Sequence, residues 1–208
     1  MDSRRMILEK IRRHQPPATN LPDPSDLGMA YDDPKAQFES MLSAVGGHVT
    51  FIESRSDVRR AIEQLDAYRS AKTVVSQVPE LSRCDIGLES LKRPHDLDGL
   101  DLAILPGEFC VAENAAIWVT DQGLPHRILY FICEHLILVV SQDAWVHNMH
   151  QAYQRLRVSD TSYGVFISGP SKTADIEQSL VIGAQGPRSL HVVLQVPPRQ
   201  SNSLRGIA

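Results

Sequence analysis

Residues 168–173 combine small and polar side chains of the kind that proteins use to bind anions. The segment reads Ser-Gly-Pro-Ser-Lys-Thr and follows the apolar run 165–167. Gly169 permits a tight backbone turn, and Pro170 restricts the next φ angle. We expect a helix to begin at Ser171, which is a favoured N-cap residue. Unpaired N–H groups at that helix start, together with hydroxyl groups and the charge of Lys172, can bind a phosphate or a carboxylate.

Neighbouring residues extend this predicted anion site. Thr173 adds a second hydroxyl group, and Asp175 favours the first turns of the expected helix through the helix dipole. Arg188 follows a turn at Gly183 and Gly186, and we expect it to reach an anion at the carboxyl edge of the sheet, where α/β folds place ligands. The simpler alternatives are that the hydroxyl groups only cap a helix and that Arg188 is an ion-paired surface residue. The candidate anion-binding residues are Ser168, Gly169, Ser171, Lys172, Thr173, Asp175 and Arg188.

The same segment does not match an ATPase P-loop. Gly164 and Gly169 have the right spacing, but Pro170 and Ser171 stand where Lys and Ser or Thr would follow. A nucleoside triphosphate would therefore lack the lysine that normally contacts its phosphates, and we exclude this motif.

Glu113 is the candidate catalytic residue. It lies between two short strand-like segments, with Ala112 before it and Ala115 two residues after it. A carboxylate that is partly removed from water has a raised pKa and can act as a nucleophile or a general base. The alternative is an ordinary turn glutamate in water.

No metal site is predicted. The three cysteines, Cys84, Cys110 and Cys133, are far apart and form no CxxC pair. His147 and His150 are expected to share one helix face, but a metal site usually needs a third ligand. We expect this chain to bind no cofactor of its own.

The elements that position these residues indicate an α/β protein. Residues 163–196 are expected to form a strand, a helix and a second strand, which at this spacing make a parallel crossover unit. Further strands are expected at 48–52, 73–76, 101–105, 115–120 and 136–140, and helices at 3–14, 34–45, 56–65 and 143–156. The predicted fold class is α/β, with a mixed, largely parallel sheet flanked by helices and an N-terminal helical arm.

We expect three parts along the chain. Residues 1–34 form a helix and a proline-containing extended arm, residues 35–196 form the α/β domain, and residues 197–208 form a flexible tail. Nothing in the arm is able to fold alone, so we expect it to contact a neighbouring subunit in a homo-oligomer.

Charge and hydropathy exclude several classes of protein. The chain of 208 residues has 21 Lys and Arg against 25 Asp and Glu, a formal net charge of −4. Sequence-independent nucleic-acid binding needs a concentrated basic face, so we expect no nucleic-acid partner. No apolar run is long enough to span a membrane, and no secretion signal is evident, so we expect a cytoplasmic protein.

One family resemblance is specific. Residues 168–177, SGPSKTADIE, followed by 183–188, GAQGPR, and 190–192, LHV, resemble the C-terminal signature of the LUD-domain family, lactate utilisation protein C type. Weaker similarity reaches back to about Pro106. The resemblance implies a fold like that of the NagB/RpiA/CoA-transferase group. It also implies a role, with two partner proteins that include iron–sulfur subunits, in oxidising L-lactate to pyruvate. For a subunit of such a system we expect a small-anion pocket lined by Glu113, Ser171, Thr173 and Arg188.

This chain departs from the family at one point, and other functions stay open. Family members usually have Ala-Glu-Thr-Gly where this chain has Ala-Glu-Asn-Ala at 112–115. One alternative is a CoA-transferase-like or folate cyclo-ligase-like enzyme that uses Glu113. Another is a non-catalytic module that senses a small carboxylate or phosphate. Whether the chain is an enzyme stays open.

Overall fold

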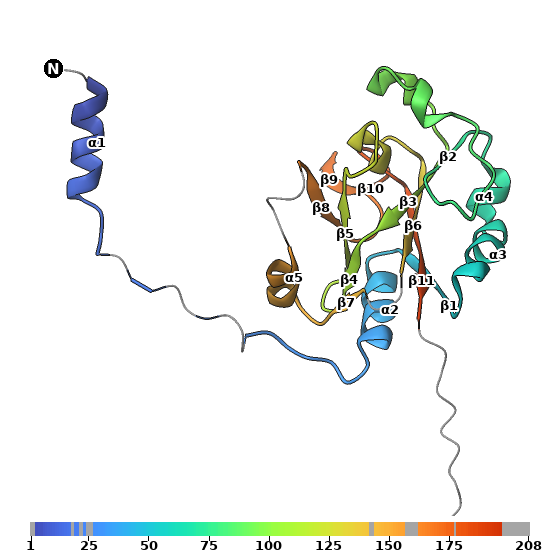
Figure 1. The fold of residues 1–208 in the computed structure, drawn as a ribbon, viewed down its shortest axis with the longest axis horizontal. Coiled ribbons are helices and arrows are strands. Elements are labelled where there is room, and N and C mark those ends of the chain that lie inside the picture. The colour runs from blue at the N-terminus through green and yellow to red at the C-terminus, as the bar shows by residue number, and fades with distance from the viewer. Residues whose placement is uncertain are drawn as a thin grey trace, which may run out of the picture.

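The structure is a computed structural model that describes residues 3–17, 19–20, 23, 27–141, 144–156, 162–176 and 178–196. The predicted tail at 197–208, the predicted helix start at Asp143 and Glu177 of the signature lie outside the described residues. Figure 1 shows an α/β body, with a helix at the N-terminal end standing away from it.

The central sheet has five strands, and every neighbouring pair is parallel. β6 lies in the middle and consists almost entirely of buried apolar residues, as expected of a parallel strand covered on both faces. The prediction of a largely parallel sheet is confirmed. In spatial order the strands are β1 (His48–Ile52), β11 (Ser189–Gln195), β6 (His135–Val140), β3 (Leu102–Gly107) and β2 (Val74–Ser76).

A second, smaller sheet makes the fold mixed. Its β4–β5 and β5–β8 pairs are antiparallel, whereas β4 and β7 are parallel. The β4–β5 hairpin turns at Glu113 and Asn114, as predicted. Its strands in spatial order are β7 (Trp145–Val146), β4 (Phe109–Val111), β5 (Ala116–Thr120) and β8 (Gly164–Ile167).

The two faces of the central sheet bury separate apolar cores. On one face, Ile62 packs with Ile104 and Val193 beneath α3 and α4. On the other face, Phe38 and Leu138 pack between the central sheet, α2 and the second sheet. The helices of the body are α2 (Pro34–Ala44), α3 (Val58–Glu63), α4 (Asp66–Ser70) and α5 (Met149–Arg155), with 3-10 helices η1 (Arg55–Asp57), η2 (Leu88–Ser90), η3 (Pro94–Leu97) and η4 (Arg127–Tyr130).

The helix predicted after Ser171 is wrong. β9 (Lys172–Ile176) and β10 (Ser179–Ile182) form an antiparallel hairpin there, and Gln178 in the turn has a φ of 57°. β8 and β11 consequently belong to different sheets, so the predicted parallel crossover unit does not exist. The segment is rich in β-branched residues, which favour an extended backbone. A helix here would also gain little from packing, since Leu180 is 67% exposed.

The helix predicted at 143–156 begins later than expected. Trp145 and Val146 form β7, which pairs with β4. α5 starts at Met149, because the side chain of Asn148 accepts a hydrogen bond from the Gln151 N–H and caps the helix. In contrast, the helix predicted from the Asp-Pro pair is confirmed: the Asp33 carboxylate accepts from the Ala36 N–H, and Pro34 is the first residue of α2.

The N-terminal arm has two parts. α1 (Ser3–Arg13) buries none of its side chains and lies far from the body in Figure 1. Closer to the body, the arm runs along the start of α5. The Tyr31 N–H donates to Nδ1 of His147 over 3.0 Å, and the Asn148 amide donates to the carbonyl of Met29 over 3.1 Å. This part of the arm therefore packs on its own chain.

A half-buried histidine makes the stability of the fold depend on pH. Nε2 of His191 lies 2.8 Å from the Thr50 hydroxyl oxygen, in the sheet formed by β1 and β11. Burial, with a smaller effect of nearby His48, lowers the pKa of His191 from 6.5 to about 4. Between these values the unfolded chain binds a proton that the folded chain does not, so the free energy of unfolding falls as the pH decreases.

We expect a loss of about 1–2 kcal/mol at pH 5 from this group alone. Chemical denaturation of the wild type and of His191→Gln at pH 7 and pH 5 measures it. The variant should lose less stability than the wild type, whereas the exposed His95→Gln control should behave like the wild type. An equal pH dependence in all three proteins would contradict this explanation.

Candidate functional site

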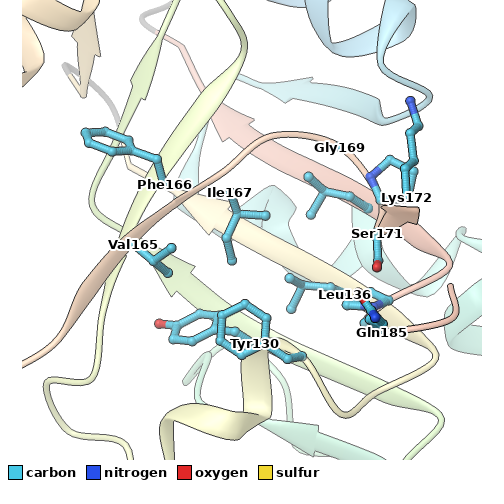
Figure 2. A pocket seen from close by; sticks show the side chains of 14 residues that line it. Tyr130, Leu136, Val165, Phe166, Ile167, Gly169, Ser171, Lys172 and Gln185 are labelled. Atoms are coloured by element: carbon cyan, nitrogen blue, oxygen red, sulfur yellow. The ribbon is translucent and has the colours of Figure 1, made fainter. Parts of the chain in front are cut away.

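A cavity of about 280 Å³ lies beside Ser171, between β8, the base of the β9–β10 hairpin and the amino ends of β6 and β11 (Figure 2). Val165 and Ile167 of β8 point toward it, as expected of alternate residues on a strand. Leu136 and Leu190 close it on the side of the central sheet. The full lining is Tyr130, Phe131, Leu136, Val165, Phe166, Ile167, Gly169, Pro170, Ser171, Lys172, Gln185, Gly186, Pro187 and Leu190.

Backbone contacts hold Ser171 at the cavity. Its N–H donates to the carbonyl of Pro187 over 2.8 Å, and its carbonyl accepts from the Gly183 N–H over 3.0 Å. Gly169, with a φ of 74°, lets the chain turn directly against the end of α2 at Val45. The hydroxyl group of Ser171 points toward the cavity in Figure 2, and it makes no hydrogen bond to any described residue.

Lys172 lines the cavity, but its charge is directed elsewhere. Figure 2 shows its ammonium group pointing away from the cavity. The group donates a hydrogen bond to the carbonyl of Val45, the residue that follows α2. A cation at the C-terminal end of a helix is favourable, because the exposed carbonyls there carry partial negative charge. Lys172 therefore connects the hairpin to α2.

Arg188 lies in a second cavity of about 410 Å³, which shares Phe131, Gln185 and Gly186 with the first. Its guanidinium group lies 3.5 Å from the carboxylate of Glu134, and both side chains are more than half exposed. Arg188 directly precedes β11 and Glu134 directly precedes β6, so this cavity is at the amino edge of the parallel sheet. The predicted position at the carboxyl edge is wrong, because a residue before a strand lies at its amino end.

The other predicted anion-binding residues do not gather at one point. The Ser168 hydroxyl donates to the carbonyl of Asn114 over 2.7 Å. The Thr173 hydroxyl accepts from the Asp175 N–H over 3.3 Å, within the outward part of β9. Neither Thr173 nor Asp175 lines the two cavities. The expected convergence on a helix start is absent because no helix forms there.

Glu113 has a structural contact in the β4–β5 turn. Its carboxylate accepts from the Met149 N–H over 2.9 Å, and its own N–H donates to the carbonyl of His147 over 3.0 Å. The side chain is exposed to solvent and is not part of the lining of either cavity. Glu113 thus satisfies a backbone donor at the start of α5.

Two titratable groups beside the cavities are held neutral. The Tyr130 hydroxyl donates to the carbonyl of Thr120 over 2.9 Å, and burial raises the pKa of Tyr130 above its ordinary value. Burial also raises the pKa of Cys133, to about 12. The Cys133 thiol is therefore protonated near neutral pH and is a poor nucleophile.

Sequence reasoning missed the apolar part of this site. It pointed to hydroxyl groups and charges, whereas the walls come from Tyr130, Phe131, Leu136 and Leu190, which look like ordinary core residues in the sequence. The alternation of Val165 and Ile167 was the available signal, but it does not reveal that their shared face borders a cavity.

The described residues contain neither a candidate metal centre nor a candidate membrane span. No three His, Cys, Asp or Glu residues among them are grouped closely enough to hold a metal ion. None of the helices in the described ranges is both long and apolar enough to cross a bilayer.

Comparison with known proteins adds a family and a fold. A family model described as the LUD domain matches residues 87–195, slightly more than half of the chain. Lactate utilization protein C 1 of Bacillus mycoides is 29% identical over 102 residues, 45% of this chain and 43% of that protein. Lactate utilization protein C of Anoxybacillus flavithermus is 24% identical over 164 residues, 71% of this chain and 74% of that protein.

A solved structure has the same fold. The crystal structure of a DUF162 family protein from Deinococcus radiodurans superposes with a TM-score of 0.62 and covers 81% of this chain and 99% of its own. The two sequences are 18% identical, so the likeness concerns the fold alone.

Proposed function

The chain belongs to the LUD domain family, and we propose that it is the ligand-binding subunit of a system that oxidises L-lactate to pyruvate with iron–sulfur partner proteins. The observation that carries the proposal is that the family-matched segment builds both cavities, since every residue that lines them falls within 87–195. The lactate utilization names of the relatives supply the substrate class.

The partners would carry the electrons. Oxidation of lactate to pyruvate releases two electrons and two protons, and iron–sulfur clusters that accept electrons are held mainly by clustered cysteines. Cys110 in β4 and Cys133 in the segment before β6 are both buried, and Cys84 is exposed at the surface. A cluster would therefore need cysteines from another protein.

Co-purification tests the partnership. The full chain is co-expressed with the cysteine-rich proteins encoded beside it, and the complex is separated by size-exclusion chromatography with light scattering. We expect the chain to elute together with the iron-containing proteins. Separate elution of every component at micromolar concentration would refute the partnership. The same measurement on the chain alone gives its mass and tests the prediction that the N-terminal arm joins a homo-oligomer.

We propose that a small carboxylate binds in the cavity of Arg188. More than half of the Arg188 side chain is exposed, so its guanidinium group is accessible to a ligand. The Glu134 carboxylate lies 3.5 Å from this group and would compete with the ligand carboxylate for it. Its backbone is fixed, because the Arg188 N–H donates to the carbonyl of Glu134 over 2.8 Å. An arriving carboxylate would replace the Glu134 side chain while this backbone bond is retained.

This site gives an expected result by calorimetry with L-lactate and pyruvate. Arg188→Met should weaken binding at least tenfold, because a hydrogen bond to a charged group contributes about 1.5–3 kcal/mol. Glu134→Gln should strengthen binding several-fold, because the competing charge is removed. Arg60→Met is the control, since Arg60 forms a similar exposed pair with Asp57 outside the site. Unchanged affinity in both Arg188→Met and Glu134→Gln would place the carboxylate elsewhere.

The alternative enzymes that use Glu113 have less support from the geometry. The Glu113 carboxylate is occupied by the Met149 N–H and lies outside both cavities. A CoA-transferase-like or folate cyclo-ligase-like reaction would need this carboxylate to be free to attack a substrate. A module that senses a small carboxylate without catalysis would use the same Arg188 site that we propose here.

A further inference from the structure

The cavity beside Ser171 has mainly apolar walls, unlike the cavity of Arg188. Tyr130, Leu136 and Leu190 are each about 1% exposed and form its inner side. Val165 and Ile167 face them from β8 (Figure 2). Burial of apolar area is favourable by about 25 cal/mol per Å², so these walls favour an apolar group over water or a small ion.

The charge of the lining excludes a carboxylate as the preferred ligand. Among the residues that the structure describes, Lys172 is the only charged one that lines the cavity, and its ammonium group is bound to the carbonyl of Val45. Arg188 is in the neighbouring cavity and pairs with Glu134. An anion among the apolar walls would lose its hydration without gaining a counter-charge, which is strongly unfavourable.

The cavity nevertheless offers defined hydrogen-bonding groups at one end. The Ser171 hydroxyl points toward it and has no partner among the described residues, and its backbone is held by Pro187 and Gly183. Gln185 lies near the hydroxyl group in Figure 2 and adds an amide. Apolar side chains combined with a few polar groups are the usual arrangement of a small-molecule site, in which the polar groups fix the orientation.

We propose that this cavity binds an uncharged ligand with one ring or two fused rings, whose hydroxyl or carbonyl oxygen hydrogen-bonds to Ser171. Its volume of about 280 Å³ is close to the lower end of the volume range of ligand pockets. Such a volume can hold one or two rings but not a larger cofactor. The ring would lie between Ile167 on one side and Tyr130 and Leu136 on the other. This ligand is separate from the carboxylate proposed at Arg188 and does not depend on it.

Two probes with the same ring system but different charge test the proposal. 1-Naphthol is neutral at pH 7, and 1-naphthoate is an anion. In calorimetry with the full chain, we expect 1-naphthol to bind at least tenfold more tightly than 1-naphthoate. In the methyl NMR spectrum of the wild type, 1-naphthol should shift the signals of Val165 and Ile167, which line the cavity.

Matched variants locate the site. Ser171→Ala should weaken 1-naphthol binding about fivefold, as expected for one neutral hydrogen bond. Thr173→Ala is the control, because it removes a hydroxyl group two residues away, in β9 and outside the cavity. Ile167→Phe should weaken binding further by filling the cavity. The NMR experiment on the wild type keeps the test valid if Ile167→Phe does not fold.

Three results would overturn the proposal. The first is 1-naphthoate binding as tightly as 1-naphthol, with affinity lost in Lys172→Met, since this would make the cavity an anion site. The second is the absence of any methyl shift for Val165 and Ile167 at millimolar 1-naphthol. The third is an equal effect of Ser171→Ala and Thr173→Ala. L-Lactate binding is measured separately, so failure of the carboxylate proposal leaves these outcomes unchanged.

Discussion

Replacing Gly169 with alanine is expected to lower the free energy of unfolding by about 2–5 kcal/mol. The residue has a φ of 74°, which a residue with a Cβ adopts at a cost of about 1–2 kcal/mol. A Cβ here would also lie 2.8 Å from the carbonyl oxygen of Val45, a backbone atom that cannot rotate away. Relieving such an overlap typically costs a further 1–3 kcal/mol, roughly the penalty of overpacking.

A matched glycine separates the two contributions. Gly99 has a φ of 77°, but nothing lies within 4 Å of the position its Cβ would take. Gly99→Ala should therefore lower stability by about 1–2 kcal/mol only, through the backbone conformation. Urea denaturation of the two variants at pH 7 gives the difference. Equal destabilisation would mean that the close approach of Gly169 to Val45 has no energetic importance.

Phe38→Ala is expected to lower the free energy of unfolding by about 3–5 kcal/mol. Phe38 is fully buried in the core between the two sheets. Its ring meets Trp145 edge-on, with the centroids 5.2 Å apart and an angle of 87° between the planes. Truncation removes apolar contact on α2 and leaves a cavity against β7, because the strand and the helix are both held by other contacts.

Two other variants test whether the loss of stability in Phe38→Ala comes from the lost volume of the buried ring. Phe38→Leu keeps most of the apolar volume and should lower stability by less than about 2 kcal/mol. Phe51→Ala removes a half-buried ring from the central sheet, over which the Lys35 ammonium group lies at 4.1 Å, and should also have a smaller effect. Thermal and urea unfolding measure all three. A Phe38→Ala protein as stable as Phe51→Ala would show that α2 is not firmly packed.

Gly169→Ala and Phe38→Ala should also affect the cavity at Ser171, because the C-terminal end of α2 lies next to the start of the β9–β10 hairpin. Val45 follows the last turn of α2 and contacts both Gly169 and the Lys172 ammonium group. Phe38→Ala would displace α2, and Gly169→Ala would push the chain at residue 169 away from α2. Either movement would shift the start of β9 relative to β8. We therefore expect both variants to bind ligands in this cavity more weakly than the wild type, even where they remain folded.

Local signals in the sequence correctly predicted much of the fold. The Asp33-Pro34 pair predicted the start of α2, and the continuous apolar run before Ser141 predicted a strand buried on both faces. The turn at Glu113 and Asn114 was also predicted. Each of these features depends on residues close together in the chain. An N-cap side chain accepts a hydrogen bond from the N–H three residues later, and a strand that is apolar throughout must be covered on both faces.

The candidate site was predicted less well, for a physical reason. From Ser171 to Ile182 the β-branched residues favour a strand, but Ser171 at the start of the segment is also a favoured helix N-cap, so the local signals conflict. Hydrogen bonds from Ser171 to Pro187 and Gly183, well separated along the chain, accompany the extended conformation. Arg188 lines one of the two cavities, but the edge of the sheet at which it lies depended on the direction of β11.

The amino-acid sequence by itself determined the α/β class, the central strand buried on both faces and the family resemblance, because these depend on periodicity, caps and a motif contiguous in the chain. Only the tertiary structure decided that part of the family signature forms the β9–β10 hairpin. It also decided that the Lys172 ammonium group binds at the end of α2, and that two cavities lie at the amino edge of the central sheet. These features arise from contacts between distant segments, such as Gly169 with Val45 and Arg188 with Glu134. The energies of such contacts depend on three-dimensional proximity, which residue types and spacing do not specify.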